Sequence, residues 1–173
     1  MKINILKVET ASQINSVANL AKEIWEEHFT PIIGSMQVEY MLKNFQSPKA
    51  ISSQIRDGYQ YYILIKNNCH VGYTALINDT NKQEMMISKI YVKNDARGYG
   101  VGNTIINFAE TECHKQKLNK LWLTVNRHNT DSIAWYIKQG FIVIDEVNKN
   151  IGNGFYMDDF IMKKTIQTTI VNQ

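Results

Sequence analysis

The chain has 173 residues, which is enough for one domain with a hydrophobic core and too few to expect two. Nineteen Lys and Arg against sixteen Asp and Glu leave a net charge of +3, so the strongly basic surface of a nucleic-acid-binding domain is excluded. The two cysteines, Cys69 and Cys113, are too few for a disulfide framework, and no Cys or His spacing matches a metal motif.

The N-terminus begins directly with an alternating, strand-like pattern and lacks a long apolar run. We therefore expect neither a signal peptide nor a membrane span, and we predict a cytoplasmic protein with reduced thiols. Internal repeats, low-complexity tracts and linkers are absent from the sequence, so residues 1–173 are expected to form a single domain.

The first two elements are a strand and an amphipathic helix. Alternation predicts the strand over residues 3–8, and Thr10 followed by Gln13 is a capping-box signature for the start of the helix. Apolar positions from residue 14 to Trp25 then share one helical face, and His28 ends the stripe. A histidine in that position is expected to be a hydrogen-bonded core residue, with a role in a substrate cleft as the alternative.

Pro31 is expected to stop this helix, and two short helices are predicted after it, over residues 37–45 and 48–57. Their aromatic and Met side chains are interpreted as core, with a lid over an organic substrate as the alternative. These residues are Phe29, Met36, Tyr40, Met41 and Phe45.

Two β-rich runs, over residues 59–66 and 70–78, are separated by Asn67 and Asn68. Asparagine tolerates the positive φ that a tight turn requires, so a β-hairpin is predicted. A third β-rich run covers residues 86–92, and all strands up to this point are expected to be antiparallel.

The third strand leads through a glycine-rich turn, residues 95–102, into a helix predicted over residues 103–116. Glycines 98, 100 and 102 allow backbone N–H groups to turn toward one point, and the helix adds its free N-terminal donors and the positive end of its dipole. The turn therefore suits an anion such as phosphate. A plain surface turn is the alternative reading.

Three known glycine-rich motifs fit this turn less well. A Walker A loop needs a Lys near its end, where this turn has Asn103, and a dinucleotide fingerprint needs a Gly at that same position. The octamer of an RNA-recognition motif begins similarly but needs an apolar residue at Gly102 and an aromatic ring at Thr104.

The helix over 103–116 must act as a crossover, which would place the next strand, residues 121–125, parallel to the strand over 86–92. A short helix over 132–138 follows and is closed by Gly140 in a left-handed conformation. Two further short strands are predicted, over residues 141–144 and 159–162, with a loop between them.

The combined motifs resemble the GCN5-related N-acetyltransferase (GNAT) superfamily over residues 85 to 165. Its pyrophosphate-loop pattern is matched by Arg97-Gly98-Tyr99-Gly100-Val101-Gly102. Its downstream pattern is matched by Asn129, Tyr136, Lys138, Gly140 and Phe141. Ser132 and Trp135 depart from the family's alanine and phenylalanine, and both substitutions still permit a helix with a buried face.

The resemblance implies a mixed α+β fold, in which helices flank a central twisted sheet of about six to seven strands with a splayed parallel pair that holds the cofactor. It also implies that acetyl-CoA is the co-substrate. The amides of residues 97 to 102, namely those of Arg97, Gly98, Tyr99, Gly100, Val101 and Gly102, would hold the pyrophosphate. The backbone of Ile90, Tyr91 and Val92 would pair with the pantetheine arm, and Asn129 would hydrogen-bond it.

Tyr136 is implied to protonate the leaving thiolate as the general acid; the bland alternative is a core tyrosine. A base is also needed, because an ammonium with a pKa near ~10 is almost fully protonated at neutral pH. The sequence leaves that base open. The candidates are Glu84, Ser88, His28, Glu27, Glu39 or water alone.

The function predicted on this resemblance is transfer of an acetyl group to a primary amine of a small molecule. Glu26, Glu27 and Glu39 could attract a cationic acceptor such as a polyamine. Acetylation of a protein lysine or N-terminus, and a non-catalytic acyl-CoA-sensing module, are the alternatives. Neither a nucleic acid nor a membrane is expected as a partner, and a homodimer is left open.

Overall fold

The computed structural model describes residues 2–167. The chain forms two compact units. The first comprises the residues up to Ile77 together with Lys89–Ile105, and the second comprises Asn78–Ser88 and the residues from Ile106 on. One strand and one helix, β4 and α5 below, contribute residues to both units.

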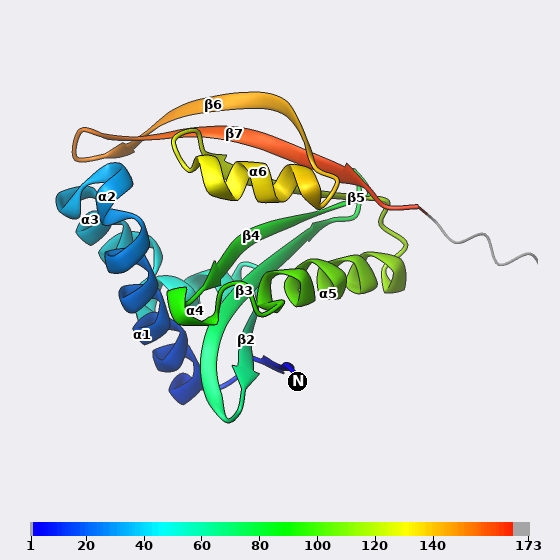
Figure 1. The fold of residues 1–173 in the computed structure, drawn as a ribbon, viewed down its shortest axis with the longest axis horizontal. Helices are drawn as coiled ribbons and strands as arrows, with labels where there is room; N and C mark the ends of the chain where they lie inside the picture. The colour runs from blue at the N-terminus through cyan, green and yellow to red at the C-terminus, as the bar shows by residue number, and fades with distance from the viewer. Residues whose placement is uncertain (1, 168–173) are drawn as a thin grey trace, which may run out of the picture. The chain divides into compact units, whose positions relative to one another are not determined.

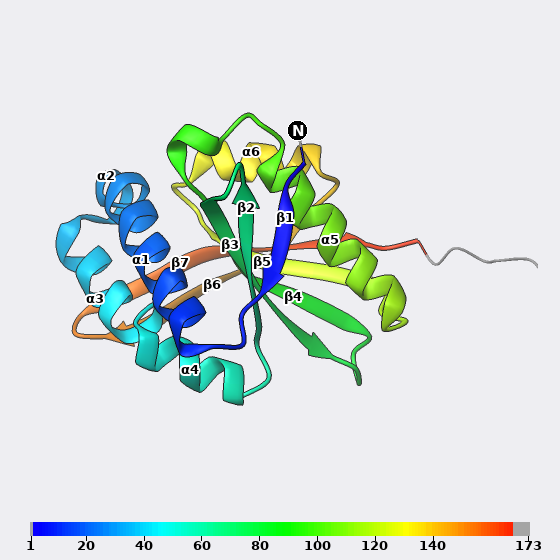
Figure 2. The same cartoon turned by 90° about the horizontal axis from the view of Figure 1, so that it is seen from below.

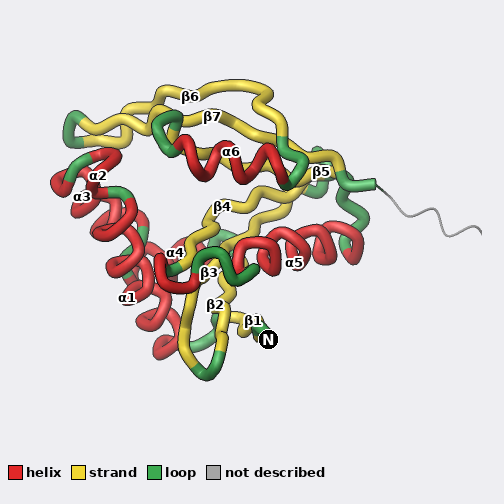
Figure 3. Tube along the Cα trace, in the orientation of Figure 1, coloured by secondary structure: helices red, strands yellow, loops and turns green. Residues whose placement is uncertain are grey.

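Figures 1 and 3 show the helices and strands of the chain. The helices are α1 (Ala11–His28), α2 (Thr30–Ile33), α3 (Ser35–Phe45), α4 (Pro48–Arg56), the 3-10 turn η1 (Asn94–Ala96), α5 (Val101–Lys115) and α6 (Thr130–Lys138). The strands are β1 (Asn4–Lys7), β2 (Gln60–Lys66), β3 (Cys69–Asp79), β4 (Glu84–Val92), β5 (Lys120–Asn126), β6 (Ile142–Gly152) and β7 (Phe155–Thr165).

The seven strands belong to one mixed sheet in the order β1-β2-β3-β4-β5-β7-β6. β4 and β5 form the parallel pair that the crossover helix requires, and this confirms the predicted α+β fold class. The registered pairs run only from Glu84 with Lys120 to Met86 with Trp122, and they include neither Ile87 nor Ser88 of the same unit. Registered pairing within the second unit therefore ends well before β4 does.

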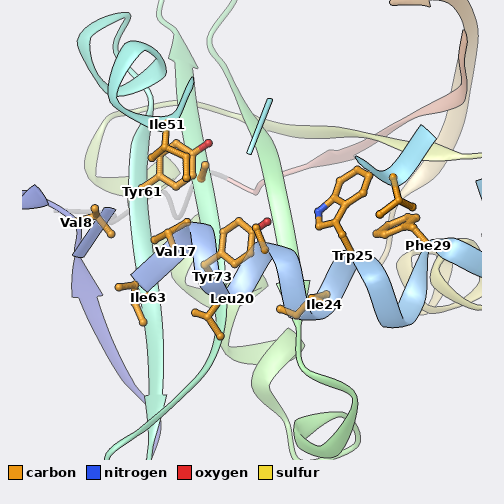
Figure 4. Packing of buried hydrophobic residues seen from close by; sticks show 13 residues of the cluster. Val8, Val17, Leu20, Ile24, Trp25, Phe29, Ile51, Tyr61, Ile63 and Tyr73 are labelled. Atoms are coloured by element: carbon orange, nitrogen blue, oxygen red, sulfur yellow. The ribbon is translucent and has the colours of Figure 1, made fainter. Parts of the chain in front are cut away.

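The core of the first unit lies between α1 and the hairpin of β2 and β3 (Figure 4). Thr10 and Gln13 form the predicted capping box, which fixes where α1 starts. Asn67 and Asn68 both have positive φ in the two-residue turn between β2 and β3, so the predicted hairpin is confirmed. Figure 2 shows β1, β2 and β3 side by side.

The sequence predicted that Pro31 ends the first long helix, and this prediction is wrong. α1 ends at His28, and Pro31 lies in the first turn of α2, where a residue without an N–H costs no hydrogen bond. The Met and aromatic set that was interpreted as core is also divided, because Phe29 is buried whereas Met36 is 74% exposed.

In the second unit, Leu121, Leu123 and Val125 of β5 alternate into the core, and the Cys113 thiol of α5 lies 3.9 Å from the Met85 sulfur. The last two strands are eleven residues each, much longer than predicted, and form a hairpin whose turn contains Asn153 at positive φ (Figure 2). Most of β6 is exposed, and its residues 145–150 are mostly polar, so hydrophobic alternation could not reveal its length. No helix within residues 2–167 is long and apolar enough to cross a membrane.

Candidate active site

The glycine-rich loop of the first unit has the shape of an anion-binding turn. Gly98 and Gly100 have φ of +79° and +83°, which L side chains rarely adopt. A Cβ built at either position would meet no atom within 4 Å, so the space beside the loop is open. Glycine is therefore required there by backbone conformation and not by crowding.

The loop leads into α5, whose intrahelical ladder starts at Thr104. The N–H of Thr104 donates to the Gly100 carbonyl at 2.9 Å, and its hydroxyl donates to the same oxygen at 3.0 Å. The amides of Val101, Gly102 and Asn103 precede that bond, so they have no acceptor inside the helix. The positive end of the helix dipole lies at the same place.

Apolar side chains hold the loop from below. Ala96 and Val101 are buried with Leu64, Val71 and Ile105 in one cluster of the first unit. The buried side chains of Ala96 and Val101 therefore anchor the loop on the sheet, while its backbone faces solvent. Sequence reasoning treated Val101 as a source of amides and missed its packing role.

The side chain of Arg97 contacts two other elements of the first unit. Its backbone N–H already donates to the Asn94 carbonyl at 3.2 Å, its Nε donates to the Val92 carbonyl at 3.1 Å, and its Nη1 lies 3.1 Å from His28 Nδ1. Arg97 thus ties the loop to the end of β4 and to the end of α1.

Two further contacts join the loop region to acidic residues of α1. Lys93 Nζ lies 2.6 Å from Glu23 Oε1, and the Asn94 amide donates to Glu27 Oε1 at 3.2 Å. The hydrogen bond to Glu23 raises the pKa of Lys93 above its ordinary value. Neither contact can be read from the sequence, because about seventy residues separate the partners.

Tyr99 lies at the exposed tip of the loop, 66% accessible to solvent. The Lys66 ammonium lies 4.0 Å from the centre of its ring, which is a cation–π contact. Lys66 comes from the hairpin between β2 and β3, and sequence reasoning did not single it out.

The β4 residues expected to hold the pantetheine arm have their side chains in cores of the first unit. Ile90 and Val92 pack with the cluster below the loop, whereas the Tyr91 ring lies 5.4 Å from Trp25 and 5.3 Å from Tyr73, centre to centre. What these three positions can offer a ligand is therefore main chain.

In the second unit, the two downstream residues predicted for the site lie at the start of α6 and within it. Asn129 is the N-cap of α6, 7% exposed, and its N–H donates to the Asn126 carbonyl at 2.9 Å. Its side chain makes no capping hydrogen bond to α6. Tyr136 follows seven residues later, about two turns along the helix and on the same face.

Tyr136 is 6% exposed, and its ring lies 5.1 Å from that of Trp135 and 5.9 Å from that of Phe141. Burial raises the pKa of the phenol well above its ordinary value, so the hydroxyl keeps its proton at neutral pH. Among the described residues of the second unit, the Tyr136 hydroxyl has no hydrogen-bond partner.

The candidate bases differ in what already engages them. Glu84 is buried, and its Oε2 forms an ion pair with Lys163 at 2.9 Å. His28 and Glu27 hold the loop region, as described above. Glu39 lines a groove of about 630 Å³ in the first unit, between α1 and α3. Lysines and glutamates both line that groove, so their charges offset one another there: Lys22, Glu26, Glu39 and Lys43.

Both thiols are free; Cys69 is exposed and Cys113 is buried. Burial raises the pKa of the Cys113 thiol to about 12, with smaller contributions from Glu110 and Glu112, so this thiol is inert near neutral pH. No group of three or more His, Cys, Asp or Glu in residues 2–167 is arranged to hold a metal ion.

Comparison with known proteins identifies the family. Residues 13–164 match the model of the acetyltransferase (GNAT) domain. A spermidine N(1)-acetyltransferase from Thermoplasma acidophilum is 23% identical over 173 residues, which cover 97% of this chain and 100% of that protein.

Solved structures share the fold. The PaiA N-acetyltransferase from Thermoplasma acidophilum, in complex with coenzyme A, has a TM-score of 0.77 at 22% identity and covers 95% of this chain and 99% of its own. The ribosomal-protein-S18-alanine N-acetyltransferase from Escherichia coli has a TM-score of 0.72 at 20% identity, with 99% of each chain covered. Because the family model spans most of the sequence, the chain belongs to the GNAT acetyltransferase family and is an N-acetyltransferase with acetyl-CoA as its co-substrate.

Proposed function

We propose that the enzyme acetylates the primary amino group of a small molecule, with a polyamine-like amine as the first acceptor to test. The observation that carries the transfer site is the loop ahead of α5, where Gly98 and Gly100 open a space beside helix amides that lack intrahelical acceptors. The acceptor class is supported by similarity, over the whole length, to a protein named a spermidine N(1)-acetyltransferase.

The loop fits the diphosphate of acetyl-CoA, which supplies an acetyl group activated as a thioester. The amides of Val101 and Gly102 and the helix dipole favour two adjacent negative charges, and the glycines let an anion approach the backbone. Lys66 above Tyr99 adds a positive charge beside this site. We expect the loop to contribute most of the affinity for the nucleotide end.

The pantetheine arm carries amide groups, which can pair with the main chain of Ile90, Tyr91 and Val92 as an added strand would. Their side chains lie in cores, so pairing would leave the packing intact. Asn129 would donate or accept a further hydrogen bond, since its side chain does not cap α6.

Tyr136 would act on the leaving sulfur. An ordinary thiol has a pKa near ~8.5, below that of this phenol, so complete proton transfer to a free thiolate is uphill. The phenol would therefore first donate a hydrogen bond to the sulfur, and the proton would move as the carbon–sulfur bond breaks.

Two other functions remain candidates. Similarity of fold to an enzyme that acetylates the alanine of ribosomal protein S18 raises acetylation of a protein N-terminus. A non-catalytic acyl-CoA-sensing module would bind CoA tightly, and a Tyr136→Phe change would then have no measurable effect.

The free thiols fit a reducing compartment, so we place the enzyme in the cytoplasm.

The test is release of CoA thiol from acetyl-CoA in the presence of spermidine, single amino acids, a lysine peptide and a peptide with an N-terminal alanine. We expect turnover with the polyamine and little with the peptides. Turnover with a peptide alone would favour protein acetylation, and tight CoA binding without turnover on any amine would favour the sensing module.

A further inference from the structure

Asp159 of β7 is a buried carboxylate without a cationic partner. It is 7% exposed, and no Lys or Arg in the described part of the chain forms an ion pair with it. Three other acids of the second unit form ion pairs: Glu84 with Lys163, Asp158 with Arg127, and Glu110 with Lys164. These include Glu84, which is nearly as buried.

Asp159 lies beside the C-terminal end of β5, and the chain runs from that end to Asn129 and α6. It is registered opposite Asn126, the last residue of β5. The Asn126 carbonyl accepts the Asn129 N–H, and its side chain accepts the His128 N–H at 2.9 Å, so this one residue joins Asp159's position to the loop before α6. The carboxyl ends of parallel strands are where ligands bind in open α/β sheets.

The neighbours of Asp159 within the second unit leave it mostly uncompensated. The Thr124 hydroxyl stabilises the carboxylate, while the adjacent Asp158 destabilises it. From β6, Val147 lies directly opposite, with Asp145 and Lys149 two residues to either side on the same face. Burial is the largest effect and raises the pKa of Asp159 to about 6.

A buried charge without a partner destabilises a fold, and such groups concentrate at functional sites. We propose that Asp159 is the general base, which takes the proton from the ammonium of the acceptor. This inference rests on the proposed acetyl transfer to an amine. The carboxylate also supplies the negative charge that a cationic acceptor needs in order to leave water.

The protons balance as follows. The Asp159 carboxylate accepts one N–H proton from the ammonium, which leaves a neutral amine with a lone pair. The amine nitrogen forms a bond to the acetyl carbon while the carbon–sulfur bond breaks, Tyr136 protonates the sulfur, and the nitrogen gives up its second proton to solvent. Asp159 then returns its proton to solvent and Tyr136 regains one. One ammonium and one thioester thus yield one amide, one thiol and one proton.

The experiment compares Asp159→Asn with Asp145→Asn, an exposed acid on the same face of the neighbouring strand. We expect Asp159→Asn to lower kcat/KM for the amine by on the order of 10²-fold or more at pH 7, with CoA affinity by calorimetry unchanged. The deficit should shrink toward pH 10, where the amine is itself deprotonated. Asp145→Asn should behave like the unsubstituted enzyme.

A loss that is the same at every pH, or no loss, would overturn the assignment. The unsubstituted enzyme tests it separately, because its kcat/KM should fall below about pH 6 with a single protonation. A flat profile down to pH 5 would count against Asp159 even if the Asn variant did not fold. Absence of turnover on any amine by the unsubstituted enzyme would instead contradict the proposed function.

Discussion

Replacing Asp159 by Asn should stabilise the protein at neutral pH while impairing it as a catalyst. Burial raises the pKa of this carboxyl from an ordinary 3.8 to about 6, which corresponds to about 3 kcal/mol of folding free energy. The folded state binds this proton more tightly than the unfolded chain does. Stability is therefore lost as pH rises from about 4 to about 6, and the full cost is present above about pH 6.

Asparagine has the same shape and no charge, and its new N–H groups can donate to the Thr124 hydroxyl. We expect a gain of between about 1 and 3 kcal/mol at pH 7.5, because an imperfectly satisfied amide offsets part of the relief. For a chain of this length that gain is a rise in Tm of roughly 3 to 10 °C. The gain should vanish near pH 4, where both side chains are neutral.

Urea denaturation without CoA, at several pH values between 4 and 8, measures this difference directly. Asp145→Asn is the control and should change stability by no more than about 0.5 kcal/mol, because its side chain is exposed. An Asp159→Asn protein that is less stable than the unsubstituted chain at pH 7.5, or a gain that does not depend on pH, would refute the argument from buried charge.

Three further predictions concern the site. Tyr136→Phe should lower kcat by on the order of 10²-fold and leave the Kd for CoA unchanged, as stopped assays and calorimetry would show; an unchanged kcat would remove the phenol from the chemistry. Gly100→Ala, at φ +83°, should cost about 1 to 2 kcal/mol of stability and weaken CoA binding. Its control is Gly154→Ala, at φ +75° in the β6–β7 turn, which should cost a similar amount of stability and leave CoA affinity intact. Glu84→Gln should destabilise the fold by about 1 to 3 kcal/mol, since it leaves Lys163 half-buried without its partner, yet retain the fall in kcat/KM below pH 6; loss of that fall would make Glu84 the base.

Several features of this protein follow from the sequence alone because they depend on neighbouring residues. The capping box of Thr10 and Gln13 and the positive φ of Asn67 and Asn68 are set by local hydrogen bonding and by tolerance for left-handed backbone. The glycine-rich loop was recognisable for the same reason. Its amides, its glycines and the helix that follows lie within a few residues of one another.

Tertiary structure decided what depends on residues far apart in the chain. Glu84 looked like a candidate base, but Lys163, 79 residues away, forms an ion pair with it. Glu27 looked like an attractor for substrate, but it accepts a hydrogen bond from Asn94. Asp159 was not among the predicted bases, because the sequence cannot tell which of the two adjacent acids, Asp158 or Asp159, is buried. Side chains alternate across a strand, so packing pairs Asp158 with Arg127 and buries Asp159 on the other face, where no Lys or Arg of residues 2–167 forms an ion pair with it.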